Sequence, residues 1–203
     1  MEGPTAIRVC FLGIMLLAAP LAGYGLDVGA DFGYVLGMYN VTNPATPPPV
    51  TSTTNYLRAD FFVDIDYLLI RVGGLMNAGP IYSTSPTPDN ARMFILNADL
   101  LGKLPVTIGV LRLWTAVGLR YVYVLLVDFD GNGVDDRPPD QVPSDLAAIL
   151  EVGGSFKVDQ KIVLGGSFLI HYDVIPNLPA GAPANATSTS ITLEFSLHVG
   201  VSL

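Results

Sequence analysis

Apolar and polar residues alternate along eight separate stretches of this chain, and this alternation limits the fold more than any other feature. In residues 26–39, every second residue is apolar, and most of the residues between them are aspartate or glycine. A period of two places successive side chains on opposite faces of a β-strand, whereas a helix repeats every 3.6 residues. The other seven stretches cover residues 57–66, 68–77, 94–100, 111–123, 146–157, 164–173 and 191–203. We therefore predict an all-β fold built from eight strands.

The connections between these stretches alternate in length. Three tight turns are predicted at residues 66–67, 102–106 and 159–161. Four long loops, rich in Pro, Ser, Thr, Ala and Asn, are predicted at residues 40–54, 79–90, 128–143 and 175–189. Short turns at one end and long loops at the other are typical of an up-and-down antiparallel sheet in which hairpin follows hairpin.

The start of the chain has the character of a secretory signal peptide. Residues 9–22 form an apolar stretch that is short for a membrane span, and small residues precede a predicted cut after Gly25. An uncleaved anchor helix is the alternative. Cys10 is the single cysteine, so cleavage would leave a mature chain without a thiol or a disulfide. We predict a signal peptide over residues 1–25 and one β-barrel domain over residues 26–203.

Two kinds of eight-stranded barrel could carry this alternation: a soluble barrel with its apolar face inside, and a membrane barrel with its apolar face against lipid. Nearly every charged residue of the strands lies on one face, together with Gly, Ala and Ser, and Arg92 is the exception. Only 14% of the residues are charged, which suits a narrow lumen of small side chains and paired charges better than a water-facing surface. Lipid also excludes an unpaired sheet edge, and an even number of strands can close. We therefore predict a transmembrane up-and-down antiparallel β-barrel of eight strands.

The segment at residues 195–203, Phe-Ser-Leu-His-Val-Gly-Val-Ser-Leu, alternates apolar residues up to the final position. In this pattern and in its strand plan, the chain resembles small eight-stranded outer-membrane proteins of the OmpX and OmpW kind, with Leu203 where that class usually has an aromatic residue. The resemblance implies a multi-pass protein of the bacterial outer membrane, inserted by the outer-membrane assembly machinery. It implies no single function, because such barrels include adhesins, narrow channels and lipid-modifying enzymes.

The polar face carries acidic and basic residues that a barrel lumen would bring together. They are Arg58, Asp60, Asp64, Arg71, Asp99, Arg112, Arg120, Glu151, Lys157 and Glu194. An isolated charge in a partly dry space bears a large desolvation cost, so we expect these side chains to pair. An eight-stranded barrel is just wide enough for its own side chains, which favours a plug of ion pairs over the alternative of a selective pore lining.

Serine, histidine and acidic residues also occur together on the last two stretches, at Ser167, His171, Asp173, Glu194 and Ser196. A lipid hydrolase would need such a set at the lipid surface, whereas the alternation points these side chains into the lumen. Ser167 and His171 would also lie about 13 Å apart along a strand. We therefore expect no catalytic site and no enzyme.

The third long loop contains a sequence similar to the front half of a calcium-binding loop. Asp128, Asp130 and Asn132 occupy its first, third and fifth positions, a glycine follows, and Asp136 is a further candidate ligand. The twelfth position is Pro139, where a bidentate glutamate belongs. The alternative is an acidic hairpin tip, since Asp-Gly and Asn-Gly form turns without a metal. A weak calcium site is therefore a hypothesis, and no other cofactor is expected.

The net charge of the chain limits the kinds of partner that it can bind. The net charge is −8 at pH 7 and no run of basic residues is present, which makes nucleic acid a poor partner. The leading hypothesis is a non-enzymatic outer-membrane protein with a largely plugged lumen, whose long loops face outward for contact or adhesion. The alternatives are a narrow channel for small solutes or small hydrophobic molecules, and a lipid-modifying enzyme. We expect a monomer in contact with outer-membrane lipid, with an extracellular ligand for its loops.

Overall fold

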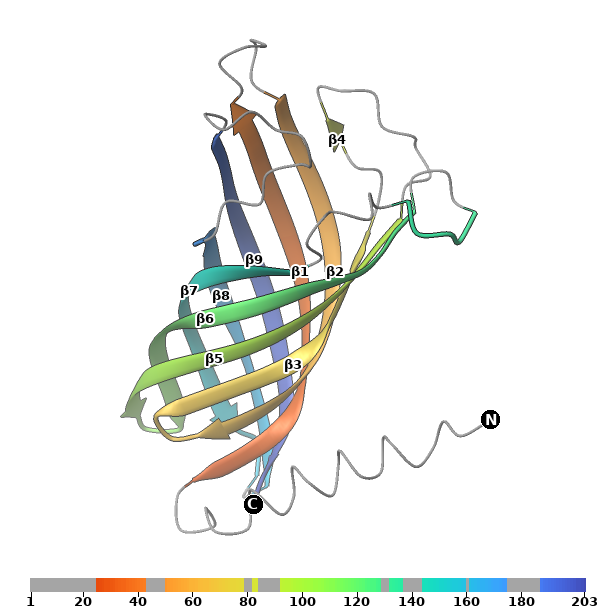
Figure 1. Cartoon of the computed structure of the whole chain (residues 1–203). Helices are drawn as coiled ribbons and strands as arrows, with labels where there is room; N and C mark the ends of the chain where they lie inside the picture. Colours follow the sequence, from red (N-terminus) through yellow and green to blue (C-terminus); the bar gives the residue numbers. More distant parts are fainter. Residues whose placement is uncertain are drawn as a thin grey trace.

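A computed structural model describes residues 25–42, 50–78, 82–83, 92–128, 132–136, 144–159, 161–174 and 187–203, which form the wall of a barrel (Figure 1). The strands are β1 (Leu26–Thr42), β2 (Val50–Ile65), β3 (Leu68–Asn77), β4 (Tyr82–Ser83), β5 (Arg92–Ile108), β6 (Leu111–Asp128), β7 (Ser144–Lys157), β8 (Ile162–Asp173) and β9 (Thr187–Ser202). None of the described residues belongs to a helix with the length and hydropathy needed to cross a membrane. Residues 1–24, which hold nearly all of the predicted signal peptide, lie outside the described residues.

Eight long strands close into a ring. Each pairs antiparallel with the next long strand along the chain, and β1 pairs with both β2 and β9. The closing β1–β9 ladder runs from Asp27 opposite Ser202 to Thr42 opposite Thr187. The prediction of an eight-stranded up-and-down antiparallel barrel is confirmed. The sequence did not predict β4, a two-residue strand that pairs with β2 outside the ring.

The short turns lie at one end of the barrel, here called the turn end, and use residues that accept unusual backbone angles. Asp66, between β2 and β3, has a φ of 37°, a region in which aspartate is one of the few side chains tolerated. Gly109, between β5 and β6, has a φ of 61°. The turn of this hairpin is therefore formed by Gly109 and Val110, and the prediction of a turn at residues 102–106 is wrong.

The wrong turn prediction has a physical explanation. Gly102 lies within the ladder and is paired on both sides. The N–H of Lys103 donates to the carbonyl of Tyr67 at 2.8 Å, and beyond this bond residues 103–108 of β5 pair with β6 alone among the described strands. Pro105 therefore sits on a strand edge, where its missing N–H costs no ladder hydrogen bond. Glycine and proline usually form turns, but in this chain Gly102 and Pro105 belong to a strand, the end of which protrudes as an edge.

Strands also reach further into the predicted loops. β1 runs to Thr42 and β2 begins at Val50, so much of the loop predicted at residues 40–54 is strand. In the same way, β9 begins at Thr187, inside the loop predicted at residues 175–189. These added residues are mostly Ser, Thr and Asn, which show no alternation of polarity, and pairing with the neighbouring strand decides their conformation.

The two faces of the wall have opposite character. Leu197 is 69% exposed on the outside, whereas Arg71, on the inside, is 1% exposed. The outer face is a nearly continuous band of large apolar side chains, which suits hydrocarbon. An apolar exterior around a charged interior confirms the membrane barrel and excludes the soluble one.

Part of the lumen is apolar, which the prediction of a polar lumen did not include. The buried apolar cluster consists of Phe62, Leu69, Leu101, Trp114, Ala116, Ile149 and Leu169. The interior of an eight-stranded barrel is filled by side chains at the density of a protein core, so apolar groups occupy the space that ion pairs leave.

Candidate functional site

Three buried arginines dominate the middle of the lumen: Arg58 of β2, Arg71 of β3 and Arg120 of β6. Each is carried on the inward side of its strand by the two-residue alternation. A guanidinium that is removed from water bears a desolvation cost of several kcal/mol, which only well-placed carboxylates can offset. The partners of each arginine therefore define the site.

Arg71 connects three strands. Its Nη1 and Nη2 donate to the two carboxylate oxygens of Glu151 on β7 at 2.7 and 2.6 Å, a bidentate pair. Its Nε lies 2.5 Å from Oδ2 of Asp31 on β1. The indole N–H of Trp114 donates to the same Glu151 at 3.2 Å. These contacts brace opposite walls of the barrel.

Arg120 forms a second set of contacts. Its Nε and Nη2 donate to the two oxygens of Asp99, both at 2.6 Å, and its Nη1 donates to Glu194 at 3.1 Å. The same Nη1 lies 3.0 Å from Nδ1 of His171, whose Nε2 lies 3.1 Å from Glu194. Two carboxylates and an imidazole thus surround one guanidinium.

Arg58 joins the other two sets. Its Nε lies 2.8 Å from Asp60, its Nη2 donates to Asp31 at 3.4 Å, and its Nη1 contacts Glu194. Asp31 therefore meets both Arg58 and Arg71, and Glu194 meets two of the three arginines as well. We call this connected group the central network; it consists of Asp31, Arg58, Asp60, Arg71, Asp99, Arg120, Glu151, His171, Glu194 and His198.

Two further groups lie nearer the turn end, and we call them the turn-end pairs. Nζ of Lys103 contacts Asp64, and Arg112 lies 3.0 Å from Asp66 and 3.7 Å from Asp27. The side chain of Arg112 is 20% exposed, so water reaches this part of the lumen.

Of the ten residues predicted for the lumen charge set, the structure brings seven together in the central network. They are Arg58, Asp60, Arg71, Asp99, Arg120, Glu151 and Glu194. Asp64 and Arg112 belong to the turn-end pairs. Lys157 is exposed and donates to the hydroxyl of Ser202 at 2.7 Å, apart from both groups. Lys103 was missed because it fell in the wrongly predicted turn, although its alternation with Asp99 could have revealed it.

The serine, histidine and acidic residues of β8 and β9 do not form a catalytic arrangement. The hydroxyls of Ser167 and Ser196 bond to each other at 2.9 Å. Both ring nitrogens of His171 face charged partners, Arg120 and Glu194, instead of a serine hydroxyl. A nucleophile needs a base within hydrogen-bond reach, and His171 is engaged elsewhere.

The predicted calcium residues lie where β6 ends. Asp128, Asn132 and Asp136 are described, and Asp130 lies outside the described residues. The carboxylate of Asp128 accepts backbone hydrogen bonds from Asn132 at 3.1 Å and from Gly133 at 2.8 Å. Within the described ranges, no group of three or more His, Cys, Asp or Glu residues could hold a metal. Calcium binding at this loop stays a prediction.

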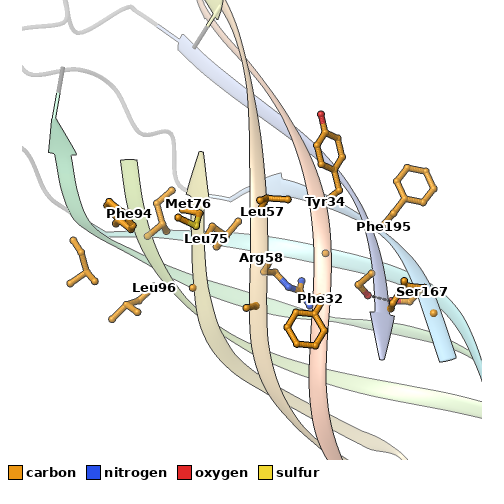
Figure 2. A pocket seen from close by; sticks show the side chains of 18 residues that line it. Phe32, Tyr34, Leu57, Arg58, Leu75, Met76, Phe94, Leu96, Ser167 and Phe195 are labelled. Atoms are coloured by element: carbon orange, nitrogen blue, oxygen red, sulfur yellow. Dashed lines mark hydrogen bonds between the residues drawn. The ribbon is translucent and has the colours of Figure 1, made fainter. Parts of the chain in front are cut away.

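A largely apolar groove of about 930 Å³ crosses the wall over β8, β9, β1, β2, β3, β5 and β6 (Figure 2). Large side chains that line it include Phe32, Tyr34, Met76, Phe94, Leu96 and Phe195. Ala59 and Gly74, which pair with each other across β2 and β3, also line it and leave space between the larger groups. The groove belongs to the apolar outer face, where lipid hydrocarbon can fill it.

Neither a protein-family model nor a curated relative matches the sequence. Solved structures with a similar fold include the outer membrane protein OprG from Pseudomonas aeruginosa, with 9% identity over 89% of this chain and 96% of that one and a TM-score of 0.54. Neisserial surface protein A has 14% identity over 87% of this chain and 99% of its own, with a TM-score of 0.46. The outer membrane protease OmpT from Escherichia coli has 8% identity over 88% and 97%, with a TM-score of 0.48. Identities this low concern the fold alone.

The closed ring of eight strands, the apolar exterior and this likeness of fold define the class of the protein. It has the fold of the small eight-stranded outer-membrane β-barrel proteins. Its apolar outer wall is suited to the lipid of a membrane that each long strand would cross. One fold can host many unrelated functions, so the particular task has to be argued from the lumen and the loops.

Proposed function

We propose that this protein is a non-enzymatic barrel with a closed lumen, which acts through its long loops by contact or adhesion at the cell surface. The observation that carries the proposal is the central network. Its three arginines project from three strands and meet carboxylates from β1, β2, β5, β7 and β9. Side chains that bridge opposite walls occupy the volume through which a solute would pass.

The energetics favour the closed state. Opening a path through the centre would separate guanidinium groups from buried carboxylates, and removing one partner of such a pair typically costs about 3–5 kcal/mol. Beside the network, a lumen cavity lined by Asp31, Arg71 and His198 offers about 20 Å³, far less than a solute needs. A channel function would therefore require rearrangement of several ion pairs at once.

The composition of the loops supports a role in contact. Residues 43–49 and 175–186 contain no charged residue and are rich in proline. Proline fixes one backbone angle, so a proline-rich loop loses less conformational entropy on binding than a freely flexible one. We also propose a monomer, since the ring closes within one chain, with bilayer lipid along its outer wall and the outer-membrane assembly machinery as the partner for its insertion.

Planar-bilayer recording tests the closed lumen. We expect no steady conductance from the refolded protein at neutral pH. Arg120→Ala should open volume in the central network and admit cations, whereas Arg112→Ala, at the hydrated turn end, is the matched control and should stay silent. Large, stable currents from the unmodified protein would contradict the proposal and support the channel alternative.

Loop replacement tests the contact function. Residues 43–49 and 175–186 would be exchanged for Gly-Ser segments of equal length, and cells carrying each form would be compared for attachment to abiotic surfaces and cell monolayers. We expect attachment to fall while the barrel keeps its heat-resistant compact form in electrophoresis. Unchanged attachment by cells with the exchanged loops would argue against loops as the contact surface.

A further inference from the structure

A small cavity lies in the lumen between the central network and the turn-end pairs. It offers about 20 Å³ to the centre of a water-sized sphere, which is room for one water molecule. Its polar lining consists of Asp27, Asp31, Asp64, Arg71, Ser155 and His198. Phe62, Leu69, Trp114 and Val163 complete the lining, so the cavity is water-sized and presents its polar groups among apolar side chains. A buried water molecule needs both this room and two to four polar partners.

Three polar atoms of this lining have no hydrogen-bond partner among the described residues: Oδ1 of Asp27, Nε2 of His198 and Nε of Arg71. Nε of Arg71 already lies 2.5 Å from the carboxylate of Asp31, which leaves Asp27 and His198. Asp27 is 4% exposed and His198 is 6% exposed, so bulk water does not serve them. A buried polar atom without a partner costs about 1–3 kcal/mol. A small molecule that hydrogen-bonds to both Asp27 and His198 would remove this cost.

The tautomer of His198 determines whether the molecule in the cavity must donate or accept a hydrogen bond at Nε2. Its Nδ1 lies 2.5 Å from Oδ1 of Asp31, and Asp31 also lies against Arg58 and Arg71, which favours its ionised form. A carboxylate can only accept, so Nδ1 carries the proton, and Nε2 of the neutral ring is an acceptor. The ring is held in this orientation by Trp114, at 5.5 Å between centroids, and by Phe62, at 6.1 Å. The cavity therefore presents two acceptors.

A water molecule matches two acceptors because it has two donors, and the hydroxyl of Ser155 can supply its third hydrogen bond. A cation fits less well, since the guanidinium of Arg71 lines the same space and no group of three His, Cys, Asp or Glu residues suited to a metal occurs within the described part of the chain. We propose that this cavity binds one water molecule, which donates to Asp27 and to His198 and carries protons between the turn end and the central network.

The water completes a chain of contacts from solvent to the middle of the lumen. The side chain of Arg112 is 20% exposed and contacts Asp27, so solvent comes close to Asp27 here, while the guanidinium itself stays protonated and relays no proton. On the other side of the cavity, His198 meets Asp31 of the central network. Charged, polar and aromatic side chains from six strands surround His198. They are Asp27 and Asp31 of β1, Asp64 of β2, Arg71 of β3, Lys103 of β5, Arg112 and Trp114 of β6, and Glu151 and Ser155 of β7. The neighbouring strand β8 places Gly165 opposite His198. His198 thus exchanges protons with the turn end alone, because the central network fills the lumen on the loop side.

Nuclear magnetic resonance tests the water directly. The chain has two histidines, so ¹⁵N-histidine labelling of the refolded protein yields two imidazole signals, and His171→Gln assigns them. We expect His198 to be protonated on Nδ1 at neutral pH and to show magnetisation transfer from a bound water. Absence of this transfer from both rings of the unmodified protein would overturn the proposal without any variant.

Variants that fill the cavity distinguish the water molecule bound there from water elsewhere in the lumen. Ser155→Thr adds one methyl group beside the cavity and should abolish the water contact of His198. Ser167→Thr adds the same methyl group to a buried serine that does not line the cavity, and should leave the contact intact. Persistence of the contact in folded Ser155→Thr would place the water outside this cavity and overturn the proposal.

Trp114, the single tryptophan, reports on proton access because a protonated imidazole quenches a neighbouring indole. In vesicles with uniformly oriented barrels, a pH drop from about 8 to about 5, the range in which histidine changes charge, would be applied to one side at a time. We expect quenching from the turn-end side, its loss in His198→Gln, and its retention in His171→Gln. Equal quenching from the loop side, or none from either side, would refute the route through the water.

Discussion

The central network and the turn-end pairs use the same residue types in the same lumen, yet they are built differently. Arg71 has two carboxylate partners within 2.7 Å and is 1% exposed. Arg112 lies 3.0 Å or more from its carboxylates and its side chain is 20% exposed. Where water cannot reach a guanidinium, several carboxylates must replace its hydration; where water can, looser contacts are enough. The depth of a charge in the lumen therefore sets how many partners it needs.

The largest effect should come from breaking the central network. Arg120→Ala leaves Asp99 and Glu194 buried without their shared cation, so we expect a loss of about 3–5 kcal/mol in the free energy of unfolding. Urea titration of the refolded barrel in lipid vesicles measures it. A loss close to zero would mean that water already solvates the centre, and the contrast with the turn end would disappear.

A second large effect concerns the outer wall and tests which face meets lipid. Leu197→Arg places a charge in the apolar band and should cost about 2–4 kcal/mol if the site lies near the midplane of the bilayer. Leu197→Val is the control and should change the same unfolding free energy little. If Leu197→Arg left the free energy of unfolding unchanged and Leu197→Val lowered it, Leu197 would face the lumen, and the assignment of the two faces would be wrong.

Breaking an ion pair at the turn end should lower the free energy of unfolding by less than breaking the central network does. Arg112→Ala removes a partly exposed ion pair, for which a loss of about 1 kcal/mol or less is typical. Lys157→Ala, which changes an exposed side chain outside both groups, should leave the unfolding midpoint unchanged. A loss for Arg112→Ala as large as that for Arg120→Ala would erase the distinction between hydrated and dry charges.

The smallest expected effect concerns calcium at the third loop, far from either group. A site with millimolar affinity would raise the free energy of unfolding by less than about 1 kcal/mol at millimolar calcium. Asp130→Asn should remove this gain, and magnesium should not reproduce it. A calcium response that survives Asp130→Asn would assign the effect to another part of the surface.

The alternation of polarity was enough to predict the strands and their faces, because each strand contacts lipid on one side and the lumen on the other. It could not show which lumen residues lie at the same height, since that depends on the stagger between strands. Lys157 illustrates the limit: its position along the strand is correct for the lumen, but the strand has already left the crowded interior. The apolar cluster around Trp114 was missed for a related reason, because these residues share a face with the charges.

Pro105 has a consequence for contacts between one barrel and another. Residues 103–108 of β5 lack a partner on the β3 side among the described strands, and an edge of this kind is a template on which another polypeptide can add a strand. Lys103 already uses its N–H toward that side, and Pro105, two residues on, has none. The edge is left with the N–H of Thr107 as its remaining donor in this direction. A second chain that added a strand along this edge would lose a ladder hydrogen bond at Pro105, so this proline disfavours edge-to-edge association of barrels.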